Sequence, residues 1–172
     1  MATTYELIAK QVLGSTTATV TFSAIPQTFD DLLLLASVRG NRTTATVTQT
    51  TLVDVYPNGS TSNLSARWIY GDGSSAASTS NASHVYVFGA SNSANWTANT
   101  FASIEVYIPN YAGATNKSIS ATSAVENNNA GAFMAAIAGL WADTSAITSI
   151  ELDPAYDFLS GCTFYLYGIK KA

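Results

Sequence analysis

Hydrophobic and polar residues alternate along much of this chain with a period of two, which is typical of a β-strand with one buried face. The alternation is clear at 17–22, 51–56, 64–70, 101–108 and 117–125, and residues that favour turns follow most of these segments. Further segments of the same character lie at 5–13, 85–88, 147–152 and 164–169, and the sequence of 16–21 recurs at 43–48. No segment clearly predicts a long helix, so we expect an all-β protein.

The run from Leu32 to Val38 departs from this alternation because only Ser37 interrupts its apolar residues. A continuous apolar run predicts a strand covered on both faces, and Pro26 and Gly40 leave too little length for a stable helix. We interpret it as the central strand of a β-sandwich. Residues 133–141 are apolar enough for a helix or a buried strand, and the spacing of the neighbouring strands favours the strand.

These strands and turns predict one domain over 1–172, an antiparallel β-sandwich of jelly-roll type with about ten strands. Small polar residues predict loops at 71–83 and 89–99, and the second loop carries Trp96 where solvent is expected. A loop tryptophan either packs back into its own domain or anchors an interface. We keep Trp96 as a candidate interface residue.

The composition points to a surface that carries little charge. Apolar residues make up 47% of the chain and charged residues only 10%, against roughly 25% charged in average soluble domains. Ser, Thr and Asn supply about a third of the residues and must form most of the polar surface. The net charge of −4 and the lack of clustered Lys and Arg argue against nucleic-acid binding. Without a basic N-terminal region or a long apolar run, we expect no signal peptide, no membrane span and synthesis in the cytoplasm.

Candidate chemistry is sparse in the sequence. His84 is the only histidine, and we expect it at the surface end of a strand. The single cysteine, Cys162, excludes an internal disulfide and is interpreted as a small apolar residue of the last strand. Residues 153–157 could form a calcium loop but lack the alternating oxygen ligands of an EF-hand. We therefore expect no enzyme, no catalytic residue, no metal site and no cofactor.

Four segments resemble a family of small virion proteins of tailed bacteriophages. They are YELIA at 5–9, VTFSAIPQTFDDL at 20–32, LSARW at 64–68 and GCTFYLYGIK at 161–170. In that family the pattern YELIA…VTFSxIPxTFxDL opens the domain and GSTFxLYGIKK closes it. Cys162 stands where the family often has Ser.

The resemblance implies a structural component of the virion, and we keep two main hypotheses. The first is a capsid decoration (cement) protein at the virion surface, which forms a homotrimer and binds the major capsid protein and possibly other virion proteins. A neutral surface can pack on a shell without desolvating ions, and oligomerisation would cover exposed strand edges. In this hypothesis the loops at 71–83 and 89–99 lie at an interface. Candidate contact residues are Trp96 and the tyrosines Tyr165 and Tyr167, which alternate with Leu166.

The second hypothesis is a receptor- or glycan-binding module of a head or tail fibre. Trp68, Trp96 and Trp141 could stack on sugar rings, and an open aromatic platform at Trp96 would favour this function. A hydrolase on the same fold is a third possibility and would require two carboxylates that converge in a cleft.

Overall fold

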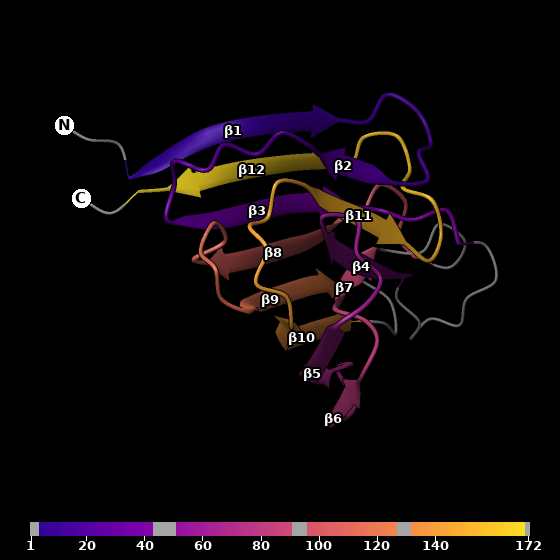
Figure 1. The fold of residues 1–172 in the computed structure, drawn as a ribbon. Helices are drawn as coiled ribbons and strands as arrows, with labels where there is room; N and C mark the ends of the chain where they lie inside the picture. Colours follow the sequence, from indigo (N-terminus) through magenta and orange to yellow (C-terminus); the bar gives the residue numbers. More distant parts are fainter. Residues whose placement is uncertain (1–3, 43–50, 91–95, 127–131, 171–172) are drawn as a thin grey trace.

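The computed structural model describes residues 4–42, 51–90, 96–126 and 132–170, which form β-strands and no helix (Figure 1). No helix that could cross a membrane therefore occurs in these ranges. The strand predicted at 43–48 lies outside the described residues. The strands are β1 (Tyr5–Val12), β2 (Val20–Phe22), β3 (Asp31–Val38), β4 (Thr51–Pro57), β5 (Leu64–Gly71), β6 (Ala76–Asn81), β7 (Tyr86–Ala90), β8 (Ala102–Pro109), β9 (Lys117–Glu126), β10 (Ala132–Trp141), β11 (Ile150–Pro154) and β12 (Thr163–Ile169).

The strand order confirms an antiparallel sandwich of jelly-roll type. An eight-stranded sheet has the order β1-β12-β3-β8-β9-β10-β5-β6, and a four-stranded sheet has the order β2-β11-β4-β7. The pairs β1·β12, β2·β11, β3·β8 and β4·β7 are antiparallel and nested along the chain, which is the pattern of a jelly roll. Figure 1 shows β1, β12 and β3 side by side at one end of the large sheet, where Tyr5 at the start of β1 pairs with Ile169 at the end of β12.

Four strands extend the large sheet beyond this pattern. The hairpin of β9 and β10 follows β8 in the sheet, and β5 and β6 complete the sheet at its far edge. The expected loop at 71–83 is wrong in part, because β6 forms within it. All of β6 except Asn81 is exposed, and among the described strands it pairs with β5 alone. Edge pairing through the backbone needs no apolar side chains, so the polar sequence concealed this strand.

The core lies between the two sheets and follows the predicted alternation. In β9 and β10 every second residue is buried, so the strand interpretation of 133–141 is confirmed. β7 contacts β8, β9 and β10 across this core. Buried aliphatic and aromatic side chains from both sheets fill it, among them Leu32, Leu34, Ile108, Ile119, Ile150, Leu152, Phe158, Phe164 and Leu166.

β3 does not have the double cover expected for it. Leu32 and Leu34 are buried in the core, whereas Leu33 and Leu35 point to the other side of the sheet and are half-buried. The reason is that the second sheet covers only one face of the large sheet. The side chains of neighbouring strands, rather than another layer, shield Leu33 and Leu35.

Turns between the strands depend on asparagine at several positions with positive φ. Asn58 (φ 52°) begins the turn after β4, and Asn110 (φ 49°) follows β8. The side chain of Asn58 also bonds to a distant segment: its Oδ1 accepts from the backbone nitrogens of Thr148 and Ser149, at 2.8 and 3.1 Å, and its Nδ2 donates to the carbonyl of Ala146 at 2.9 Å. One side chain thus joins the β4–β5 turn to the segment that leads into β11.

Candidate functional site

Among the described residues, one face of the large sheet points away from the small sheet and has no second layer over it, and we call it the outer face. Cross-strand pairing defines its residues as rows that run across the sheet. One row comprises Leu7, Tyr167, Leu33, Tyr107, Ser120, Ala138, Arg67 and Ser80. A second row comprises Lys10, Tyr165, Leu35, Glu105, Thr122, Ala136, Ile69 and Ser78.

Tyr165 and Tyr167 lie on the outer face, while Leu166 between them is fully buried in the core. The expected alternation of these tyrosines with Leu166 is therefore confirmed, and the structure shows that Leu166 is the residue that packs inward. Both tyrosines are half-buried, and Lys10 Nζ lies 5.3 Å from the centre of the Tyr165 ring. The flat rings and apolar stems of these residues leave a largely apolar surface over β1, β12 and β3.

The outer face also carries most of the large apolar side chains that are exposed. Met134 is 67% exposed, Ile69 64% and Leu7 51%. Between β6, β5, β10 and β9 the face is hollowed into two adjoining shallow depressions of about 570 and 700 Å³. Their shared lining is Ile69, Ser78, Thr122 and Ala136, all of them uncharged, and Arg67 is the one charged side chain in the lining of the two depressions.

Trp96 does not serve as a surface anchor in the structure. It is only 5% exposed and belongs to the hydrophobic core, so the loop tryptophan packs back into its own domain. Burial of the large indole removes more apolar surface from water than an exposed loop position would. Trp141 is 2% exposed, and Trp68 is a half-buried residue packed against the core. None of the three tryptophans forms an open aromatic platform.

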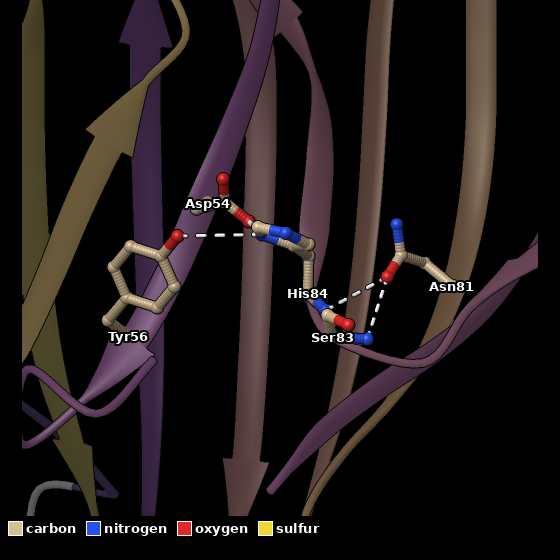
Figure 2. Close-up of polar contacts among 5 residues, drawn as sticks. All are labelled: Asp54, Tyr56, Asn81, Ser83 and His84. Atoms are coloured by element: carbon tan, nitrogen blue, oxygen red, sulfur yellow. Dashed lines mark hydrogen bonds and ion pairs between the residues drawn. The ribbon is translucent and has the colours of Figure 1, made fainter. Parts of the chain in front are cut away.

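A polar cluster on the small sheet was not predicted from the sequence (Figure 2). His84 Nδ1 lies 3.0 Å from Asp54 Oδ1, and the Tyr56 hydroxyl lies 3.5 Å from the same nitrogen. Asn81 Oδ1 accepts hydrogen bonds from the backbone nitrogens of Ser83 and His84, at 2.7 and 3.1 Å. These bonds fix the turn between β6 and β7 and hold His84 beside β4. His84 lies just before β7 with its side chain 35% exposed, as expected for the surface end of a strand, but its contact with a carboxylate was not expected.

The electrostatics of this cluster are dominated by burial. Desolvation raises the pKa of the Asp54 carboxyl above its usual 3.8, the interactions with His84 and Tyr56 oppose the rise, and the charge of Asp153 adds to it. Asp54 and Asp153 are cross-strand partners, so the structure contains a neighbouring pair of carboxylates of the kind that a hydrolase would require. A histidine held by a carboxylate can move protons, but hydrolysis would also need a nucleophile and a substrate cleft. None of the five hollows described on the protein is lined by Asp54, Asp153 or His84.

Two further candidates from the sequence lie in structural positions. Within the described parts of the chain, no group of three or more His, Cys, Asp or Glu side chains could hold a metal ion, and this includes residues 153–157. Cys162 is fully buried at the start of β12, and burial raises the pKa of its thiol. Its Sγ accepts from the Arg39 backbone nitrogen at 3.2 Å.

The Asp54–His84 pair joins residues 30 positions apart in the chain. The alternation of residues 51–56 does place Asp54 and Tyr56 on one face of a strand. Nothing in the local sequence indicates that His84 returns to that face.

Comparison with known protein families, with curated proteins and with solved structures finds no match for this chain.

Proposed function

We propose that this protein is a capsid decoration protein of a tailed bacteriophage, which forms a homotrimer and binds the major capsid protein at the virion surface. The sequence resemblance supports the proposal, because its segments fall on β1, on β2 to β3, on β5 and on β12, which belong to the framework of the sandwich. The role requires protein contacts and neither a cofactor nor a catalytic group.

The observation that carries the proposal is the uncovered, largely uncharged outer face. Large exposed apolar patches on soluble proteins mark interaction surfaces, and here Met134 and Ile69 project from a floor of Ala, Ser and Thr. The charged side chains that the described strands of the large sheet direct to the outer face are few and of both signs: Lys10, Asp31, Arg67, Glu105 and Glu126. Such a face packs on another protein with little loss of ion hydration.

The edge strand β6 supports the same assignment. It borders the hollow on the outer face, and it leaves one side of its backbone without a partner strand among the described residues. An exposed strand edge of this kind favours association with another chain. The segment 71–83, which the decoration hypothesis places at an interface, therefore lies beside the proposed contact surface.

The test uses single charged substitutions on the outer face. Met134→Glu and Ile69→Glu place a carboxylate at positions that are already solvent-exposed, so the fold should tolerate them. The molar mass of the free protein, measured by light scattering, reports contacts between copies. Cosedimentation with capsid shells that lack the protein reports binding to the shell, and cryo-electron microscopy of decorated shells locates it.

The matched control is Thr19→Glu, an exposed residue directly before β2 of the small sheet. We expect the wild type and the control to form trimers and to decorate the shell at regular positions. At least one outer-face variant should lose about tenfold or more of either association, because burying an unpaired carboxylate is costly. Wild-type behaviour of both outer-face variants, or density only at the tail or on a fibre, would contradict the proposal.

No structural observation favours the glycan-binding alternative. Its expected platform depended on Trp96, which lies in the core.

A further inference from the structure

A buried arginine without a counter-ion lies directly after β3. Arg39 is only 7% exposed, and its Nε is fully buried with no hydrogen-bond partner. In the described parts of the chain, no carboxylate forms a salt bridge with Arg39, and its side chain has no hydrogen bond. Burial of this N–H group is unfavourable, because it loses its hydration without gaining a hydrogen bond, and the nearby charge has no counter-ion. A group from outside these residues could supply the missing negative charge.

The backbone at Arg39 is fixed on both sides. Its nitrogen donates to Cys162 Sγ at 3.2 Å, and its carbonyl accepts from the backbone nitrogen of Leu159 at 2.8 Å. Gly40, the next residue, forms a β-bridge with Phe158. The end of β3 is thus held by the connection between β11 and β12. The backbone that carries the guanidinium is therefore already ordered, so binding a ligand does not require this backbone to become ordered.

Arg39 lines a pocket of about 270 Å³. The other polar side chains in the lining are Thr16, Asn99 and Ser160, and the remaining lining residues are apolar. No Asp or Glu is among them. Hydroxyl, amide and guanidinium groups can all donate hydrogen bonds to an anion, and only the guanidinium is charged.

We propose that this pocket binds a small oxyanion, with the Arg39 guanidinium as its counter-ion. A guanidinium offers parallel N–H donors that match two oxygens of a phosphate, sulfate or carboxylate. The pocket is large enough for such an ion or for a small organic acid that carries it. The protein as a whole is negatively charged, so anion binding would depend on this local site rather than on the overall field. The inference stands independently of the proposed virion function.

The first measurement is the thermal unfolding midpoint of the purified protein in phosphate, in acetate and in glucuronate, each against sodium chloride at equal ionic strength. A ligand that binds only the folded state raises the Tm. At an anion concentration ten times its Kd, we expect a rise of about 3–6 °C for a chain of this size. The three salts distinguish a tetrahedral ion, a simple carboxylate and a sugar acid as the source of the anionic group.

Two substitutions of the same residue identify the site. Arg39→Gln removes the charge and should abolish the anion-specific rise, leaving only the general salt effect. Arg39→Lys keeps the charge but loses the paired donors, so the rise should fall by half or more. The lysine variant keeps the test informative if the glutamine variant does not fold. Arg67→Gln is the control, since Arg67 is an exposed arginine on the outer face.

The proposal is supported if at least one anion stabilises the wild type and the Arg67 variant well above the Arg39 variants. It is overturned if none of the three anions raises the Tm above that in chloride. It is equally overturned if the rise is the same with and without the Arg39 side chain. Neither result bears on capsid binding, which depends on the outer face.

Discussion

The aromatic ring of Phe29 lies directly against the backbone of Gly168 in β12. A Cβ atom built at Gly168 would stand 2.3 Å from Cγ of Phe29, far inside van der Waals contact. Phe29 is 8% exposed, and Lys170 Nζ lies 4.9 Å from the centre of its ring. The segment before β3 is thus packed on β12, next to the point where the start of β1 pairs with the end of β12. Glycine at 168 is required for this close approach rather than for a special backbone angle.

We therefore predict that Gly168→Ala is destabilising although it adds only one methyl group. The ring of Phe29 must move, and overpacking of this kind costs about 1–3 kcal/mol. Urea unfolding measures the free energy of unfolding of both proteins. In a Phe29→Ala background, which itself costs about 3–5 kcal/mol, the further loss from Gly168→Ala should become small. An equal loss in both backgrounds would show that the two residues are not coupled.

Asn58 gives a second prediction, because its side chain and its backbone contribute separately. Asn58→Ala loses the bonds to Ala146, Thr148 and Ser149. It also keeps a β-carbon at φ 52° without the short polar side chain that lets asparagine tolerate this conformation, which otherwise costs about 1–2 kcal/mol. Asn58→Gly loses the same bonds but tolerates the angle. We expect both variants to be less stable than the wild type, and the alanine variant to be the less stable of the two.

Calorimetric unfolding of the two variants separates these contributions. A glycine variant as stable as the wild type would mean that the exposed hydrogen bonds of Asn58 add nothing. Equal stability of the alanine and glycine variants would mean that the positive φ is not maintained in solution.

The strand pattern could be predicted from the sequence wherever burial is one-sided. β9 and β10 show this best, because every second side chain is buried in the core and the sequence alternates in the same way. β6 could not be predicted in this way, since it is held by backbone bonds to β5 and buries almost none of its side chains. Hydrophobic and polar residues alternate in a strand because one face is buried, and an exposed edge strand has no such buried face.

The candidate sites were less predictable because they depend on contacts between distant segments. The orientation of Tyr165 and Tyr167 follows from the parity of one strand. The environments of Trp96, His84 and Arg39 cannot be predicted from one strand, since each is formed by segments that lie far apart in the sequence. The outer face illustrates both cases: single strands predict which residues point outward, but the sheet order is needed to show that no second sheet of the described residues packs on that face.

The thiol of Cys162 gives a third prediction. The residue is fully buried, so a reagent cannot reach its sulfur in the folded protein. Burial also raises the pKa of the thiol, which lowers the fraction of reactive thiolate. We expect native protein to react with iodoacetamide at least about a hundredfold more slowly than unfolded protein, which corresponds to an opening free energy of about 3 kcal/mol.

The control is a Cys162→Ser chain that carries Thr19→Cys, whose thiol lies at an exposed position. This protein should react rapidly when folded. Rapid labelling of native wild-type Cys162 would show that the start of β12 opens easily, which conflicts with its position between β1 and β3.

Asp54 gives a prediction for the dependence of stability on pH. Burial raises the pKa of its carboxyl above the usual 3.8, so in the folded state the residue holds a proton more tightly than in the unfolded chain. The contribution of Asp54 to stability is therefore complete below about pH 3.8 and declines as the pH rises through the folded-state pKa. Asp54→Asn cannot ionise and lacks this decline.

Urea unfolding of wild type and Asp54→Asn from about pH 3 to pH 7 tests this directly. The stability of the wild type relative to the variant should fall as the pH rises and then level off. Repeating the comparison in an Asp153→Asn background should give a smaller fall, because the charge of Asp153 contributes to the raised pKa of Asp54. A relative stability that increased with pH would instead mean that the interaction with His84 outweighs burial. Asp54 would then be a stabilising ion-pair partner, and the cluster would hold the β6–β7 turn most firmly when the carboxylate is charged.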